Sequence, residues 1–231
     1  MIINTIYGAH NASKARGLTV VIDVFRAFST ACYIFGNGAK SMIPVETIEE
    51  AFQLRKEHPE YILVGERNGA IIPGFDYGNS PFELLTCDFL GKTIIHTTTM
   101  GTRGLVNAKK ATELLTGSFV NAGSIIRHIK QKNPKEISLV CTGTPDSKIL
   151  NEDALFAIYI SNELRNKPNN FQHMKESLRA PEFSSWFFDP AITSHPLEDF
   201  DLCLSLNRFN FILVAESNTD GFLYLKKVST I

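Results

Sequence analysis

Residues 18–38 are LTVVIDVFRAFSTACYIFGNG, and this stretch contains the basic unit of the fold. Residues 18–24 form an apolar, β-branched run, which predicts a buried β-strand. Residues 27–38 follow with helical spacing and finish in Gly36 and Gly38, which predicts a helix that ends there. A strand followed directly by a helix is the repeating unit of a parallel sheet covered by helices.

The same alternation continues along the chain. Further strands are predicted at 41–45, 61–65, 93–97, 113–119, 136–141 and 211–215, and further helices at 46–58, 121–133 and 151–166. We therefore expect an α/β fold with a mostly parallel, mixed sheet and helices on both faces, in αβα layers, as one unit or as two tightly joined α/β subdomains. The chain 1–231 is expected to form a single domain. Its irregular, aromatic stretch 167–206 would be a helical cap on the site or a contact in a homo-oligomer.

Composition excludes several classes of protein. Hydrophobic residues make up 44% and charged residues 20% of the 231 residues, which excludes a disordered chain. The formal net charge of -1 provides no basic excess for nucleic acid or an acidic membrane surface. No secretory signal or spanning apolar run is present, so we expect a cytoplasmic protein. Cys32, Cys87, Cys141 and Cys203 form no CxxC pair, so we expect reduced thiols.

Polar residues follow the predicted strands, where ligands bind in open α/β sheets. Asp23 ends the first strand, and Arg26 follows at a helix start, where the two could face a phosphate ester together. The alternative for Asp23 is a helix-capping acid. Residues 136–141 are followed by Glu152 and Asp153, which either favour the helix dipole or provide oxygen ligands at the same edge.

Two connections are unusually polar. The stretch GERNGAIIPGFDYGNSP, 65–81, is far longer than an ordinary connection, which favours a binding loop over a plain link. Its candidate site residues are Glu66, Arg67, Asp76, Asn79 and Ser80. The stretch HTTTMGTRG, 96–104, is predicted to form an oxyanion cradle at a helix start, although threonines also favour strands. Its candidates are Thr97, Thr98, Thr99, Gly101, Thr102 and Arg103.

The candidate ligands favour a hard cation over zinc. Carboxylates are abundant at the predicted site, whereas the six histidines show no HxH or HExxH spacing. Mg²⁺ prefers oxygen ligands and binds through one or two carboxylates together with substrate phosphate. His96 within a strand is expected to be a satisfied core histidine, and Cys141 a buried thiol.

These motifs, in this order, resemble the 2-phosphosulfolactate phosphatase (ComB) family. The resemblance covers roughly residues 18–162, and GERNG with GFDYGNSP is its most diagnostic part. It implies a Mg²⁺-dependent phosphatase that hydrolyses 2-phosphosulfolactate, a step toward coenzyme M. It places Asp23 and Arg26 at the reacting centre, Glu66 and Asp76 in the diagnostic loop, and Glu152 with Asp153 near the metal. Glu66, Asp76, Glu152 and Asp153 are the candidate metal ligands, and which carboxylate acts as ligand, base or nucleophile stays open. Met100 stands where the family usually has Asn.

The resemblance also implies that residues Thr97 to Thr102 bind phosphate or sulfonate. Arg67, Asn79, Ser80 and Arg103 are further candidates for binding the small anionic substrate. The leading hypothesis is a phosphatase for a small phosphorylated hydroxy acid with a second anionic group. The alternative is a catalytically silent module that binds such a metabolite. A serine α/β hydrolase is disfavoured because no GxSxG motif is present.

Overall fold

Ten strands form one mixed sheet in the computed structural model, which describes residues 1–143, 151–189 and 191–230. Their order across the sheet is β1-β8-β2-β7-β9-β10-β3-β6-β4-β5. The bounds are β1 Ile2–Tyr7, β2 Gly17–Ile22, β3 Ser41–Pro44, β4 Ile62–Arg67, β5 Ala70–Ile71, β6 Thr93–Thr97, β7 Ala111–Gly117, β8 Glu136–Cys141, β9 Phe211–Ser217 and β10 Leu223–Ser229.

The sheet consists of two parallel blocks joined by the C-terminal hairpin. Strands β1, β8, β2 and β7 form the first block, and β3, β6 and β4 form the second. The hairpin β9–β10 lies between them and pairs antiparallel with β7 on one side and with β3 on the other. Because three antiparallel pairings separate β7 from β3, the two blocks run in opposite directions.

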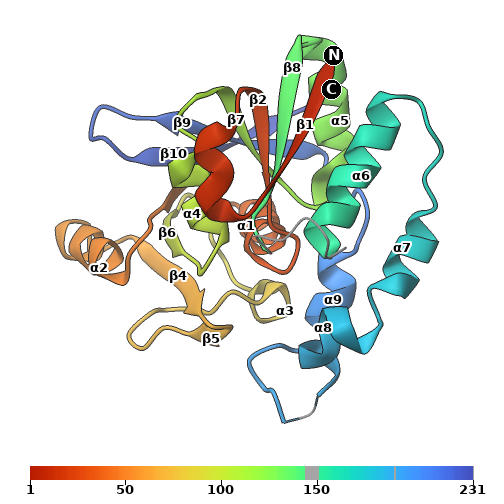
Figure 1. Ribbon diagram of the computed structural model, residues 1–231. Helices are drawn as coiled ribbons and strands as arrows, with labels where there is room; N and C mark the ends of the chain where they lie inside the picture. Colours follow the sequence, from red (N-terminus) through yellow and green to blue (C-terminus); the bar gives the residue numbers. More distant parts are fainter. Residues whose placement is uncertain (144–150, 190, 231) are drawn as a thin grey trace.

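Twist brings the carboxyl ends of the two blocks together. Each step between neighbouring strands rotates the strand direction by roughly 20–25°, so the five steps from β2 to β6 accumulate a rotation on the order of 100°. In Figure 1, β4 accordingly crosses the direction of β1 and β8 at a large angle. Loops that follow β2, β8, β4 and β6 can therefore line one pocket.

Helices cover both faces of the sheet, as the alternation in β2 shows. Val21 belongs to a core cluster with Phe28 of α1, whereas Val20 and Ile22 belong to a second cluster with Phe156 of α6. Successive strand residues point to opposite faces, so a strand covered on both sides is apolar throughout. The predicted α/β fold with a mostly parallel, mixed sheet is confirmed (Figure 1).

The predicted helices are present with small shifts of their ends. The helical segments are η1 Ala9–Lys14, α1 Ala27–Gly36, α2 Ile48–Glu57, α3 Pro81–Leu84, α4 Gly101–Asn107, η2 Phe119–Asn121, α5 Ala122–Lys132, α6 Glu152–Leu164, α7 Phe171–Ser177, α8 Pro181–Phe188 and α9 Leu197–Cys203. The irregular stretch 167–206 contains α7, α8 and α9. None of the described helices has the length and apolar character needed to cross a membrane.

Strands β1, β5 and β10 were not predicted from the sequence. Strand β1 is a partly exposed edge strand with Asn4 and Thr5 in its middle, and β5 has only two residues. Strand β10 contains the exposed pair Lys226 and Lys227. Polar residues interrupt the apolar pattern in β1 and β10, so pairing with neighbouring strands, rather than local sequence, identifies them.

Candidate active site

A pocket of about 230 Å³ lies where the carboxyl ends of the two blocks meet. Eight of the predicted site residues line it: Asp23, Arg26, Glu66, Asn79, Thr98, Thr99, Glu152 and Asp153. Its other lining residues are Phe25, Ala27, Asn68, Gly69, Met100, Gly143 and His195. A larger pocket of about 470 Å³, bordered by β7, β10 and α4, contains none of the predicted residues. The chemistry of the lining residues therefore favours the smaller pocket.

Asp23 is held firmly at the end of β2. Its Oδ1 accepts a hydrogen bond from the Ala27 backbone N–H at 2.9 Å, and its Oδ2 accepts one from the Thr142 hydroxyl at 3.1 Å. A β-carbon on Gly101 would lie 2.8 Å from Asp23 Oδ2. Gly101 therefore provides the space that lets the start of α4 approach this carboxylate, a role that the sequence alone did not indicate.

The start of α6 places two more acids in the pocket. The Asn151 side chain caps the helix by accepting from the Ala154 backbone N–H at 3.0 Å. Asp153 accepts from the Val24 N–H at 2.9 Å and from the Gly143 N–H at 3.0 Å, so it ties α6 to the loops after β2 and β8. The polar sequence CTGTPDS, 141–147, starts at the end of β8, and its residues 144–147 lie outside the described residues.

These carboxyl groups are buried close to one another. Burial and the neighbouring Asp153 raise the pKa of Asp23 from 3.8 to about 8. Burial and Glu152 raise the pKa of Asp153 to about 8, and burial is the main reason that the pKa of Glu152 rises to about 7. Strongly shifted pKa values are typical of functional sites, because burying unpaired acids of like charge does not stabilise the folded protein.

Glu66 projects into the pocket from the second block. Its Oε1 accepts from the Thr99 N–H at 2.6 Å, and its Oε2 accepts from the Gly69 N–H at 2.7 Å and the Thr99 hydroxyl at 3.0 Å. Thr98 and Thr102 bond each other through backbone N–H and hydroxyl groups at 3.1 and 3.2 Å. In the stretch that the sequence predicts as an oxyanion cradle, the backbone N–H groups of Thr98, Thr99 and Thr102 bond to protein partners and fix Glu66 and the start of α4.

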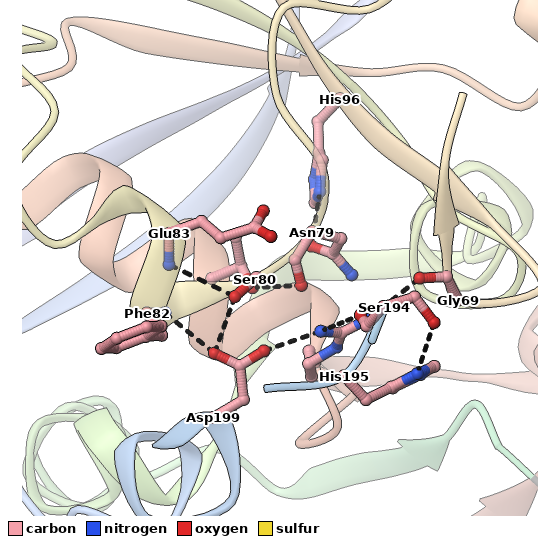
Figure 2. Close-up of polar contacts among 11 residues, drawn as sticks. Gly69, Asn79, Ser80, Phe82, Glu83, His96, Ser194, His195 and Asp199 are labelled. Atoms are coloured by element: carbon pink, nitrogen blue, oxygen red, sulfur yellow. Dashed lines mark hydrogen bonds and ion pairs between the residues drawn. The ribbon is translucent and has the colours of Figure 1, made fainter. Parts of the chain in front are cut away.

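Arg26 reaches the pocket from the residue before α1. Its guanidinium donates to Asp199 Oδ2 at 2.6 Å and to the Ser194 carbonyl at 3.1 Å through Nη1, and to the Gly69 carbonyl at 3.3 Å through Nη2. Figure 2 shows Gly69, Ser194 and His195 on one side of Asp199, with Phe82 on the other. Both Arg26 and Asp199 are buried.

Two histidines adjoin the site. His96 is fully buried, and its Nε2 lies 3.3 Å from Asn79 Oδ1 (Figure 2). Its Nδ1 has no partner among the described residues, so His96 is only half satisfied, contrary to the expectation for a core histidine. Burial lowers the pKa of His96 to about 4, so its ring is neutral and can donate from Nε2, which would leave the Asn79 amide NH₂ free for the pocket.

His195 lines the opposite part of the pocket. Its Nδ1 lies 3.0 Å from the Ser194 hydroxyl, and burial and Arg26 lower its pKa to about 4. Gly69 has a φ of 83°, and a β-carbon there would lie 2.1 Å from His195 Cε1. A glycine is therefore required at 69 both for its backbone conformation and for the close approach of His195.

Several predicted residues lie outside the pocket. Asp76 forms an ion pair with Arg55 at 2.6 Å and accepts from the Leu63 N–H, so the structure does not bring it to the other acids. Arg103 is exposed and pairs with Glu46 at 3.4 Å. Both side chains are directed by local charged partners that the motif spacing does not reveal.

The remaining predicted residues support the pocket from behind. Arg67 donates to the Thr97 hydroxyl at 2.8 Å and to the Glu66 and Glu46 carbonyls, and it does not line the pocket. Ser80 donates to Asp199 Oδ1 at 2.9 Å. Thr102 is buried against Thr98, and Gly101 contacts Asp23 as described above.

His195 and Asp199 are functional residues that the sequence patterns do not indicate. Both lie in the stretch 167–206, where no strand end or recognisable motif marks a site. The only local sign is the pair of acids, Glu198 and Asp199, in the first turn of α9, which is also the ordinary preference of a helix start.

The donor set of the pocket fits a divalent cation. Asp23, Glu66, Glu152 and Asp153 supply carboxylate oxygens, and Arg26 is the one arginine or lysine that lines this pocket among the described residues. No three acidic, histidine or cysteine side chains in residues 1–143, 151–189 and 191–230 converge enough to enclose a metal by themselves. Mg²⁺ commonly uses only one or two carboxylates and completes its shell with water and phosphate, so this arrangement suits it.

Comparisons with known proteins agree with the motifs. A family model described as 2-phosphosulpholactate phosphatase matches residues 4–186. A probable 2-phosphosulfolactate phosphatase of Caldanaerobacter subterraneus subsp. tengcongensis is 40% identical over 165 residues, which cover 69% of this chain and 68% of that protein. Proteins of the same name from Caldicellulosiruptor saccharolyticus and Thermotoga petrophila are both 44% identical, over 144 and 138 residues. These two matches cover 61% and 60% of this chain, but only 59% and 58% of the relatives, less than two thirds of their length.

Proposed function

The chain belongs to the 2-phosphosulfolactate phosphatase family, and we propose that it hydrolyses the phosphate monoester of a small hydroxy acid that carries a second anionic group, with 2-phosphosulfolactate as the first candidate substrate. One observation supports this most directly: Asp23, Arg26 and Glu152, from three separate elements, line one pocket together with Glu66. The names of the relatives support the substrate class.

The size of the pocket favours a small substrate. Its volume of about 230 Å³ is below the roughly 300–1,000 Å³ of pockets that enclose drug-sized ligands. A phosphorylated three-carbon acid is small enough for such a space. Because four carboxyl groups line the pocket, an anionic substrate binds only if their charge is offset.

A Mg²⁺ ion is the proposed source of that offset. One or two of the pocket carboxylates of Asp23, Glu66, Glu152 and Asp153 would hold it, with water and phosphate completing its shell. When bound, the ion would supply positive charge for phosphoryl oxygens. The raised pKa values of Asp23 and Asp153, caused first by burial and then by a neighbouring acid, support this proposal, because a bound cation would favour the ionised carboxylates.

The protein's own groups act on both parts of the substrate. Asp23, fixed by Ala27 and Thr142, acts at the reacting phosphorus, by direct attack or by orienting a water molecule. Arg26 stabilises charge on the transferring phosphoryl group. We assign the Asn79 amide and the His195 ring, which line the pocket, as hydrogen-bond donors to the second anionic group.

Phosphate release tests the proposal directly. Purified protein is incubated with 2-phosphosulfolactate and a panel of phosphorylated hydroxy acids, with Mg²⁺ and then with EDTA. We expect metal-dependent release that Asp23→Asn abolishes. Asp76→Asn is the matched control, because it removes an aspartate of a neighbouring motif that lies outside the pocket, and it should retain activity and metal dependence.

Two outcomes would contradict the proposal. Full activity in Asp23→Asn would remove Asp23 from the reacting centre. A rise in melting temperature with the panel compounds, without phosphate release under any metal condition, would instead support a binding module.

A further inference from the structure

The orientation of Arg26 depends on a segment far away in sequence. Of its five guanidinium N–H donors, two on Nη1 bond Asp199 Oδ2 and the Ser194 carbonyl, and one on Nη2 bonds the Gly69 carbonyl. Within the described chain, the Nε hydrogen and the second Nη2 hydrogen have no protein acceptor. Because Arg26 also lines the pocket, these two hydrogens are the ones available to a substrate anion.

Asp199 is itself fixed on every side. Its Oδ1 accepts from the Ser80 hydroxyl at 2.9 Å and from the Phe82 N–H at 2.8 Å, and its Oδ2 accepts from Arg26 at 2.6 Å. The side chain of Asp199 has no exposed surface. Figure 2 shows Asp199 of α9 in contact with Ser80, the N-cap of α3, and with Phe82 in the first turn of that helix. The carboxylate therefore connects two helices to the guanidinium.

This arrangement matters for catalysis because a guanidinium is a planar fork. Its donors match a phosphate only in the correct orientation, and a misplacement of about 1 Å costs on the order of 10²-fold in rate. Two backbone carbonyls alone would leave the buried positive charge of Arg26 without a counterion. The carboxylate provides both the direction and the charge.

We propose that Asp199 is a positioning residue for Arg26. It holds the guanidinium so that the two free N–H groups of Arg26 are directed toward the phosphoryl site. This inference rests on the proposed function for Arg26 but adds a residue that lies beyond the matched residues 4–186. It makes the segment around α9 part of the active site and not only a cover over the core.

A double-mutant cycle separates positioning from a general structural role. Asp199→Asn keeps an oxygen for Ser80 and Phe82 but removes the charge that holds Arg26. We expect it to lower kcat/KM by about 10²-fold and to weaken inhibition by inorganic phosphate to a similar degree. In an Arg26→Met background, Asp199→Asn should change both quantities by less than about threefold, because the group that it positions is already absent.

Asp201→Asn is the matched control on the same helix. Asp201 is exposed and pairs with Lys175 at 2.8 Å and Arg179 at 3.2 Å, so this change removes an acid of α9 without touching the site. We expect kcat/KM within about twofold of wild type. If Asp199→Asn does not fold, Ser80→Ala loosens Asp199 while keeping the ion pair, and it should produce a smaller loss in the same two measurements.

The outcomes are distinct. A kcat/KM within threefold of wild type in folded Asp199→Asn would overturn the proposal, as would an equal loss in the Arg26→Met background. If wild-type protein shows no phosphatase activity, the proposed function fails while the positioning is still measurable by NMR of the guanidinium. Slow rotation should give separate Arg26 Nη–H signals in wild type and merged signals in Asp199→Asn, and unchanged signals would overturn the proposal.

Discussion

The substitution Asp23→Asn should stabilise the metal-free protein while it removes catalysis. The side chain keeps its shape, and its oxygen can still accept from the Ala27 N–H. The Thr142 hydroxyl has the Ile22 carbonyl at 3.0 Å as a second acceptor besides Asp23 Oδ2, so in the variant it can donate to Ile22 while its oxygen accepts from the new amide. The change therefore removes a buried ionisable carboxyl group with little loss of hydrogen bonding.

The size of the effect follows from proton linkage. The pKa of Asp23 is about 8 in the folded protein, against 3.8 in an ordinary carboxyl group. Between these two values the folded protein retains a proton that the unfolded chain has released, so its stability falls by about 1.4 kcal/mol for each pH unit. Asparagine lacks this penalty. From pH 5 to pH 7, the stability of Asp23→Asn relative to wild type should therefore rise by about 3 kcal/mol.

Urea unfolding of both proteins in EDTA at pH 5, 6 and 7 measures this difference. Asp76→Asn is the control, because its carboxylate is partly exposed and paired with Arg55, so its curve should run parallel to that of wild type. Excess Mg²⁺ should stabilise wild type increasingly as the pH rises, and should stabilise Asp23→Asn less. Parallel pH profiles of wild type and Asp23→Asn in EDTA would refute the argument that buried, mutually repelling acids line the pocket.

Three further changes test the arrangement of the site. Arg103→Ala removes only an exposed ion pair with Glu46, so kcat/KM should stay within about twofold of wild type, and a tenfold loss would place Arg103 at the substrate. Gly101→Ala introduces a β-carbon 2.8 Å from Asp23 Oδ2, so a melting curve should show about 1–3 kcal/mol of destabilisation, with a loss of activity. His195→Ala removes a hydrogen bond to an anionic group, which is worth about 1.5–3 kcal/mol. KM should therefore rise tenfold or more, while the melting temperature changes little. An unchanged KM would exclude contact between His195 and the substrate.

The local elements and the positions of the acids along them can be predicted from the order of the amino acids. The apolar run 18–24 and the helical spacing that follows are local patterns, and strand β2 and helix α1 occur where those patterns predict them. The carboxyl ends of parallel strands carry ligands, so Asp23, Glu66 and Asp153 could be selected before their neighbours were known. The motifs that resemble the family lie in the loops after these strands, so the sequence also indicated the family.

How the elements meet, and which side chains face the pocket, depends on contacts between segments that are distant in the sequence. The hairpin β9–β10 enters the middle of the sheet and reverses the second block, and no local pattern specifies a pairing between strands so distant in sequence. Asp76 and Arg103 are drawn away by Arg55 and Glu46, although their motifs are at the site. Arg26 is paired with Asp199, 173 residues later in the chain. Side-chain direction depends on twist, packing and the nearest countercharge, and these arise only when distant segments come together.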